Sequence, residues 1–248
     1  MPVLPGAEPY FHDGGDVSVL LCHGYTGTPQ SLRPWAEHLA AAGLTVRLPL
    51  LPGHGRTWQE MNATRWQDWY AEVRTAFRAL RERSSHVFVA GLSMGGLLAT
   101  KLAQDHGAGV SGLVLVNPIY AHDNRLLRLL PVLQRAVASF PGIASDIKRP
   151  GVVELAYDRN PLRAMHSQTQ LWSIVSQALP EVTQPVLLLH SAVDHVVPPS
   201  SSALLLSRIS STDVTEVVLH DSYHVATLDN DAPRIFDESL AFIRRLAA

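Results

Sequence analysis

The 248-residue sequence contains one cysteine, Cys22, and only two lysines, Lys101 and Lys148. A lone cysteine excludes an intramolecular disulfide framework and fits a reducing compartment. The sequence also lacks any run of the ~18 uncharged apolar residues that a membrane-spanning helix needs. Its first residues, MPVLPGAEPYFHDGGD, lack the basic start and the apolar run of a signal peptide. We therefore expect a soluble, cytoplasmic protein.

An excess of charge of either sign is missing as well. The chain has 20 basic and 22 acidic residues, which gives a formal net charge of −2. Nothing here supplies the basic surface that nucleic-acid binding requires, so we expect no nucleic-acid partner. Apolar residues make up 46% of the chain and charged residues 17%, which is enough for a sizeable core and too little charge for a disordered chain. The length suits a single domain over residues 1–248.

The apolar pattern alternates short runs rich in β-branched residues with helical spacing. The predicted strands are residues 17–22, 45–50, 86–90, 112–116, 185–190 and 214–219. The predicted helices are residues 31–43, 66–83, 94–106, 199–209 and 232–246. Strands that are separated by helices of this length need crossover connections. The sequence therefore predicts an α/β fold, with a mostly parallel central sheet and helices on both faces.

Residues 119–179 break this alternation, because no strand is predicted there and the stretch LLRLLPVLQRAVASFPGI is leucine-rich and interrupted by proline. We expect residues 119–165 to form a helical insertion that lies on the sheet. The alternative interpretation is additional core. An insertion at this place would lie over the carboxyl ends of the strands, where ligands bind in open α/β sheets.

A candidate nucleophile lies in the pentapeptide GLSMG at residues 91–95, between a predicted strand and a predicted helix. Strand, tight turn and helix are the context of a nucleophile elbow, which presents Ser93 at the edge of the sheet. The turn holds the serine in a strained backbone conformation, and a Cβ at Gly91 or Gly95 would crowd its neighbours.

A serine hydroxyl needs an adjacent base that is itself oriented by a carboxylate, and in this fold the order along the chain is Ser, acid, His. Asp194 follows the strand at 185–190, and His224 follows the strand at 214–219. Both lie in loops at the carboxyl ends of strands. We predict that Asp194 is the acid and His224 the base.

Other residues near these loops compete for the same roles. His195 adjoins the proposed acid and His220 ends a strand, but only His224 follows the last strand by a loop long enough to reach the nucleophile. Asp213 and Asp221 are interpreted as solvated loop carboxylates, and Asp221 could hold the loop that carries His224.

An oxyanion hole requires two backbone N–H groups aimed at the substrate carbonyl. One is expected from Met94, which follows the nucleophile at a helix N-terminus. The other is expected from Tyr25 in HGYTG, residues 23–27, where His23 is interpreted as bracing the loop.

Metal and cofactor signatures are missing from the sequence. Twelve histidines are present, but no HExxH and no Cys/His cluster at ligand spacing occurs. Phosphate-loop and dinucleotide fingerprints are missing as well. Cys22 lies in the run VLLC and is interpreted as a small buried hydrophobe. We expect no metal and no cofactor.

Several motifs carry a family resemblance. HGYTG, LPGHG at 51–55 and GLSMGG at 91–96 resemble the α/β-hydrolase superfamily. The segments GIASDIKRPGVVELAY at 142–157, VDHVVPP at 193–199 and SYHVATLDND at 222–231 closely resemble the bacterial monoacylglycerol lipases, a group related to small thermophile carboxylesterases. The resemblance spans nearly the whole chain, and it implies an α/β-hydrolase fold with a small helical cap.

The resemblance also implies roles for individual residues. It assigns the triad to Ser93, Asp194 and His224, and the oxyanion hole to Tyr25 and Met94. Relatives commonly carry phenylalanine in place of Tyr25, so the hydroxyl is expected to add a hydrogen bond near the oxyanion site.

In the cap, the resemblance makes residues 119–165 mobile, Glu154 a contact of the glycerol hydroxyls and Ile143 a gate at the pocket mouth. Eight apolar cap residues are expected to line a tunnel for the acyl chain: Leu126, Leu127, Leu129, Leu130, Val132, Leu133, Val137 and Phe140. An exposed apolar cap is also expected to contact membranes or micelles transiently.

The resulting hypothesis is a serine hydrolase that cleaves monoacylglycerol to glycerol and fatty acid through an acyl-enzyme. The nearest alternative is a general carboxylesterase for short-chain or xenobiotic esters. A non-catalytic protein that binds a small ligand under the cap belongs to a different class, and a thioesterase or a peptidase would use the same triad.

Overall fold

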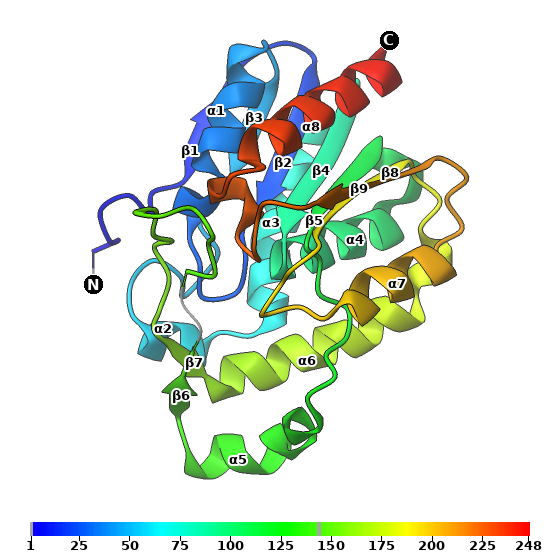
Figure 1. The fold of residues 1–248 in the computed structure, drawn as a ribbon. Coiled ribbons are helices and arrows are strands. Elements are labelled where there is room, and N and C mark those ends of the chain that lie inside the picture. The colour runs from blue at the N-terminus through cyan, green and yellow to red at the C-terminus, as the bar shows by residue number, and fades with distance from the viewer. Residues whose placement is uncertain (1, 143–144) are drawn as a thin grey trace.

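The computed structural model describes residues 2–142 and 145–248 (Figure 1). Its centre is a seven-stranded sheet in the order β1-β3-β2-β4-β5-β8-β9. The strands are β1 (Tyr10–His12), β2 (Val17–Cys22), β3 (Thr45–Leu48), β4 (His86–Leu92), β5 (Gly112–Val116), β8 (Val186–Ser191) and β9 (Val214–Leu219). Only the edge strand β1 runs antiparallel to its neighbour, and the other pairs of this sheet are parallel.

Helices cover both faces of this sheet (Figure 1). One face packs against α1 (Arg33–Ala41) and α8 (Ala232–Ala247), and its core contains Trp35. The other face packs against α3 (Trp66–Arg81) and α4 (Met94–His106), and its core contains Trp69. The predicted doubly covered, mostly parallel sheet is therefore confirmed.

Further helices complete the second face. They are α2 (Trp58–Ala63), α6 (Leu162–Gln177) and α7 (Pro199–Arg208). Single 3-10 turns lie at η1 (Pro29–Leu32), η2 (Gly107–Gly109), η3 (Arg125–Leu129), η4 (Leu179–Glu181) and η5 (Ala226–Leu228). Among the described residues, no helix has the length and apolar character to cross a membrane.

The register of the parallel strands brings the site loops together. Cys22 pairs with Gly91, so β2 and β4 end side by side. On the other side of β5, Ser191 pairs with Leu219 at the ends of β8 and β9. The loops after β2, β4, β8 and β9 therefore emerge at one edge of the sheet.

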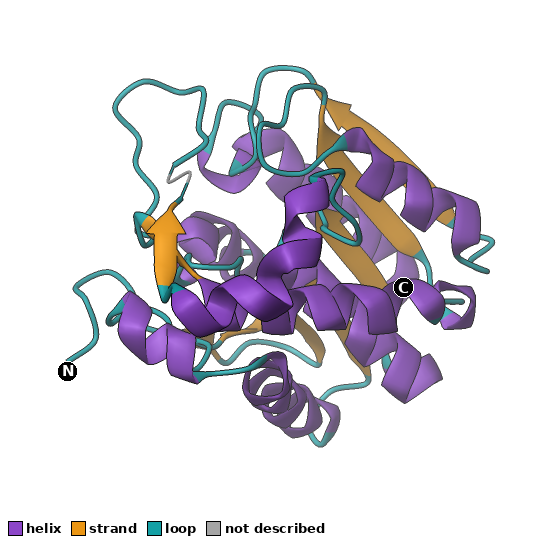
Figure 2. Ribbon diagram, turned by 90° about the horizontal axis from the view of Figure 1, so that it is seen from below, coloured by secondary structure: helices purple, strands orange, loops and turns teal. Residues whose placement is uncertain are grey.

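The chain between β5 and α6 lies outside the sheet, and we call this segment the cap. It contains η3, α5 (Leu130–Ala136), β6 (Ser139–Pro141) and β7 (Arg159–Pro161). Its elements α5, β6 and β7 lie toward the lower end of the view in Figure 1. The strands β6 and β7 pair antiparallel, with Phe140 opposite Asn160, so the expectation that this stretch has no strand is wrong. Figure 2 shows this pair standing apart from the main sheet.

The predicted end of the insertion at residue 165 falls inside α6. This helix begins at Leu162 and packs against α4, with Leu171 and Val175 fully buried in the core. The expected boundary therefore cuts a core helix that the sequence analysis did not predict. The short elements β1 and α2 were also not predicted.

Candidate active site

Ser93 lies at the turn between β4 and α4 with φ 56° and ψ −117°. A positive φ is rare for a residue with a side chain and costs on the order of 1–3 kcal/mol. The N–H of Ser93 donates to the carbonyl of Val116 at 2.9 Å, which ties the turn to the end of β5. The strained turn presents the hydroxyl beyond the carboxyl end of β4.

Three glycines make this turn sterically feasible. A Cβ on Gly91 would overlap the backbone of Gly95, and a Cβ on Gly95 would overlap the carbonyl of Cys22. A Cβ on Gly96 would lie 2.9 Å from the Cβ of Pro118. The steric reason predicted for Gly91 and Gly95 is therefore confirmed.

Asp194 and His224 form a buried pair. The His224 Nδ1–H donates to Asp194 Oδ2 at 2.8 Å, and each side chain is 8% exposed. The other carboxylate oxygen of Asp194 accepts the N–H groups of Val196 and Val197 at 2.8 and 2.7 Å. Burial raises the pKa of Asp194, but the His224 charge and these hydrogen bonds outweigh it and hold the pKa below 3.8.

The same contacts set the basicity of the imidazole. Burial lowers the pKa of His224, whereas the charge of Asp194 and its hydrogen bond raise it, with smaller contributions from Glu154 and Asp146. The net effect raises the pKa above 6.5. With Nδ1 bound to a carboxylate, Nε2 of the neutral ring is the atom that can accept a proton.

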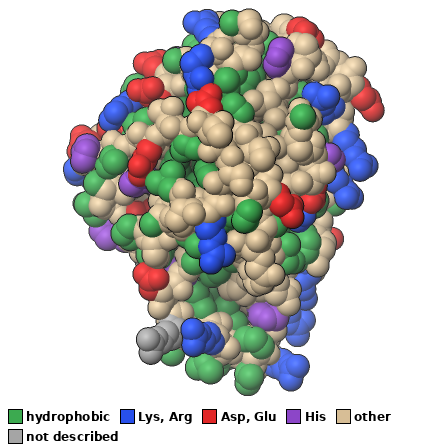
Figure 3. Space-filling model, turned by 90° about the vertical axis from the view of Figure 1, so that its right-hand side faces the viewer, with side chains coloured by type: hydrophobic (Ala, Val, Ile, Leu, Met, Phe, Trp, Pro, Cys, Tyr) green, Lys and Arg blue, Asp and Glu red, His purple; other side chains and the backbone are tan. Residues whose placement is uncertain are grey.

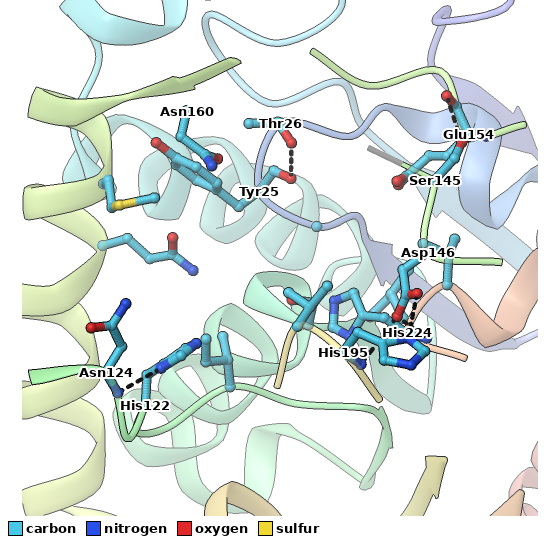
Figure 4. A pocket seen from close by; sticks show the side chains of 18 of the residues that line it. Tyr25, Thr26, His122, Asn124, Ser145, Asp146, Glu154, Asn160, His195 and His224 are labelled. Carbon is cyan, nitrogen blue, oxygen red and sulfur yellow. Dashed lines mark hydrogen bonds and ion pairs between the residues drawn. The ribbon is translucent and has the colours of Figure 1, made fainter. Parts of the chain in front are cut away.

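A cavity of about 290 Å³ lies between the core and the cap. Ser93 and His224 both line it, so the structure brings the nucleophile candidate and the base candidate to the same cavity. Tyr25 and Glu154 line it as well. Figure 4 shows Tyr25 on one side of the cavity, and Glu154 and His224 on the other.

Tyr25 and Met94 lie on either side of the end of β4. Met94 is the first residue of α4, and Tyr25 belongs to the loop after β2, next to the end of β4. Within the described chain, the N–H groups of these two residues donate no hydrogen bond. Tyr25 lines the cavity, and Met94 directly follows Ser93, which also lines it.

The hydroxyl of Tyr25 points away from this position. It donates to the carbonyl of Pro161 at 2.8 Å, at the start of α6. The expectation of a hydrogen bond near the oxyanion site is therefore wrong. The hydroxyl instead ties the loop after β2 to the base of the cap.

His23 braces the same loop, as expected. The N–H of Leu51 donates to its Nε2 at 3.1 Å, and its Nδ1 pairs with the carbonyl of Gly24 at 3.0 Å. Cys22 is fully buried, and burial raises the pKa of its thiol, so it is a core residue and not a nucleophile.

The structure places the competing residues differently. His220 is exposed. His195 lines the cavity, but its ring Nδ1 is engaged by Asp146 at 2.8 Å. Asp213 forms an exposed ion pair with Arg245.

Asp221 does not hold the loop of His224 through its side chain, which pairs with Lys148 at 2.6 Å on the surface. That task falls to Asp229, which is fully buried and accepts the N–H of Tyr223 at 2.9 Å. Asp231 accepts the N–H of Asp221 at 2.8 Å.

Asn117 is a site residue that the sequence analysis missed. It follows β5 with φ 43°, and its side-chain N–H donates to the carbonyl of His224 at 2.8 Å. Its side-chain oxygen accepts the N–H of Ser191 at 2.8 Å. A polar residue directly after a buried strand at the ligand-binding edge was the available signal.

Glu154 lines the cavity with its carboxylate close to the loop after β2, since a Cβ on Gly27 would lie 2.7 Å from Oε1. Burial raises the pKa of Glu154 to about 7, and the charge of His224 opposes this shift. The N–H of Glu154 donates to the hydroxyl of Ser145 at 2.6 Å. Ile143, the predicted gate, lies outside the described residues.

The later part of the cap is fastened to the core at two places. At the first, Lys148 and Arg149 donate their N–H groups to Asp229 at 2.7 and 2.9 Å. At the second, Leu155 donates its N–H to the side chain of Gln30 at 3.0 Å, and Tyr157 donates its N–H to the carbonyl of Thr26 at 3.2 Å.

The predicted acyl tunnel is largely wrong. Of the eight apolar residues, only Leu127 and Phe140 line the cavity. Leu130 is buried, and five others are exposed: Leu126, Leu129, Val132, Leu133 and Val137. The reason is that α5 lies away from the main sheet (Figure 1), which leaves apolar side chains such as Val132 and Leu133 exposed. Ile119, Met165 and Trp172 supply apolar wall in their place.

A protein-family model described as "Serine aminopeptidase, S33" matches residues 16–231 of this chain. A thermostable monoacylglycerol lipase of Bacillus sp. (strain H-257) is 41% identical over 253 residues, which covers 99% of this chain and 98% of that protein. A carboxylesterase of Bacillus subtilis (strain 168) is 24% identical, with 96% and 97% covered.

Among solved structures, one of the metagenome-derived lipolytic enzymes LipS and LipT matches with a TM-score of 0.96 and 43% identity. The match covers 98% of this chain and all of that one.

Proposed function

The chain belongs to the serine aminopeptidase S33 family of α/β-hydrolases, and from this premise we propose that it is a serine hydrolase that cleaves monoacylglycerol to glycerol and a free fatty acid. The observation that carries the proposal is the cavity lined by both Ser93 and His224, with Asp194 bound to Nδ1 of the imidazole. The 41% identity to a monoacylglycerol lipase over nearly the whole chain supports the choice of ester.

The proposed reaction has two steps. His224 Nε2 removes the proton of Ser93, and the serine oxygen attacks the ester carbonyl. His224 then protonates the departing glycerol oxygen, which leaves an acyl-enzyme. Water, activated by His224, hydrolyses the acyl-enzyme, while Asp194 keeps the imidazole oriented and stabilises its cation.

We assign the oxyanion hole to the N–H groups of Tyr25 and Met94. Negative charge develops on the carbonyl oxygen in both steps, and preorganised donors stabilise it with no reorganisation at that moment. The N-terminus of α4 adds a favourable dipole at Met94.

We assign the glycerol end of the substrate to the side of the cavity that holds Glu154. A carboxylate that is largely removed from water accepts hydrogen bonds from hydroxyl groups strongly. A monoacylglycerol presents two free hydroxyls there, whereas a triacylglycerol presents none. This contrast favours the monoacylglycerol.

We also propose that the cap contacts lipid aggregates transiently. The exposed apolar residues of η3 and α5 gather at the lower end of the molecule, which Figure 3 shows from the side. Such a surface suits the interface of a micelle or bilayer, where a poorly soluble substrate is stored.

A general carboxylesterase is the second candidate, favoured by the similarity to the carboxylesterase of Bacillus subtilis. Rates on monoacylglycerols, diacylglycerols, triacylglycerols and short alkyl esters separate the two. We expect kcat/KM to be highest for monoacylglycerols; equal or higher values for short alkyl esters would favour the carboxylesterase.

Ser93→Ala is the matched test of the catalytic assignment. We expect ester hydrolysis to fall by about 10⁶-fold, as in other triads, while the unfolding temperature stays within a few degrees. A fluorophosphonate should label wild type and not the variant. Retained hydrolysis by folded Ser93→Ala would reject the assignment.

A further inference from the structure

A carboxylate of the cap lies between the loop that carries Asp194 and the loop that carries His224 (Figure 4). Asp146 Oδ2 accepts the backbone N–H of His224 at 3.1 Å and that of His195 at 3.2 Å. Asp146 Oδ1 accepts the ring Nδ1–H of His195 at 2.8 Å. The side chain of Asp146 is 9% exposed, so these three donors replace most of its water.

The positions of these donors matter more than their number. One belongs to His224 itself, and the other two belong to the residue that directly follows Asp194. A single carboxylate therefore fixes both sides of the 2.8 Å bond between Asp194 and His224. Hydrogen bonds from N–H groups to a carboxylate are about twice as strong as neutral ones, which suits this task.

The backbone around Asp146 is fixed as well. Its carbonyl accepts the N–H of Val225 at 3.0 Å. Shortly after it in the chain, Lys148 and Arg149 donate their N–H groups to the carboxylate of Asp229. Asp229 also accepts the N–H of Tyr223 at 2.9 Å. This part of the cap and the loop of His224 therefore form one hydrogen-bonded unit.

We propose that Asp146 is a positioning residue for catalysis, which holds the acid loop and the base loop in the register that the proposed triad needs. The inference rests on the proposed function, because it concerns the geometry of that same triad. It makes this part of the cap a component of the catalytic framework and not only a cover over the cavity.

The charge of Asp146 adds an electrostatic consequence. The carboxylates that face the imidazole of His224 are Asp194, Glu154 and Asp146, and all three favour its protonated form. His195 is the titratable group on the far side of Asp146. Removal of the Asp146 charge therefore lowers the pKa of His224 and shifts the acidic limb of kcat/KM to lower pH.

The test is Asp146→Asn, an amide of the same shape that turns an NH₂ group toward at least one of the three N–H donors. We expect kcat to fall by about 10²-fold with KM within threefold, since small misplacements of catalytic groups have effects of this size. The acidic limb should move to lower pH. Asp221→Asn is the matched control, because it removes an exposed carboxylate that pairs with Lys148 of the same segment, and its kcat should stay within twofold.

His195→Asn provides a second variant that leaves the fold intact even where Asp146→Asn does not, because the His195 side chain is 51% exposed. We expect it to lower kcat about threefold, and the double variant should be no slower than Asp146→Asn alone, because residues of one network are not additive.

Different failures point to different claims. Asp146→Asn with kcat within twofold of wild type and an unmoved limb would overturn the inference, as would His195→Asn with wild-type kcat. A drop in unfolding temperature without a change in either kinetic quantity would assign Asp146 to stability alone. A wild-type enzyme that hydrolyses no ester would overturn the proposed function itself.

Discussion

At the scale of single residues, the site depends on groups whose protonation is set by burial and by neighbours. The pKa of His224 is raised above 6.5 because Asp194 and two further carboxylates offset the cost of burial. The pKa of Glu154 is raised to about 7 by burial. Glu154 therefore changes charge close to neutral pH, and His224 changes charge above 6.5.

The pH profile follows from the direction of the His224 shift. The base must be neutral, so kcat/KM should fall as pH falls through the raised pKa, with a midpoint above 6.5. The measurement is kcat/KM on an uncharged ester from pH 5 to 9. A flat profile, or a midpoint well below 6.5, would contradict histidine as the base in this environment.

Glu154→Gln tests the head-group assignment. The variant keeps the shape of the side chain but accepts hydrogen bonds from glycerol hydroxyls less strongly. We expect kcat/KM for monoacylglycerol to fall about tenfold, and that for a p-nitrophenyl ester to fall less than threefold. Glu216→Gln, a surface carboxylate paired with His190, is the control. Equal losses on both substrates would remove Glu154 from the head-group subsite.

At the scale of elements, the apolar surface of the cap helix is the feature with the clearest consequence. Leu129 and Val132 are 51% and 67% exposed and lie at the junction of η3 and α5. The double variant Leu129→Asp, Val132→Asp should leave kcat on a soluble short-chain ester unchanged and raise the apparent KM several-fold for long-chain monoacylglycerol in micelles.

Phe11→Asp is a matched control for the cap variant, since Phe11 is 58% exposed on the edge strand β1, away from the cavity. It should change neither quantity. An unchanged apparent KM in the cap variant would show that the apolar surface plays no part in reaching the lipid.

The same elements show where a sequence pattern is sufficient. The strands β2, β4, β5 and β8 were predicted because they are buried on both faces or nearly so, and such strands read as continuous apolar runs. The strands β1, β6 and β7 have three residues each, too few to show any period. For α5, the apolar spacing predicted a buried face. Spacing alone does not show whether another part of the chain packs against that face.

At the scale of the whole molecule, long-range contacts account for what the sequence did not reveal. Ser93, Asp194 and His224 could be named from a motif and from chain order. Asp146 and Asn117 could not, because their roles depend on the crossing of segments that are far apart in the chain. Asn117 reaches His224 across 107 positions, and Asp146 reaches it across 78.

The later part of the cap is attached through backbone amides at two places. Asp229 holds the first, and Gln30 with the carbonyl of Thr26 holds the second. A main-chain N–H is present whatever side chain the position carries, except for proline. Substitutions in the outer part of the cap, which contains η3 and α5, can therefore change which acyl groups bind. The residues that carry out the reaction below the cap stay the same.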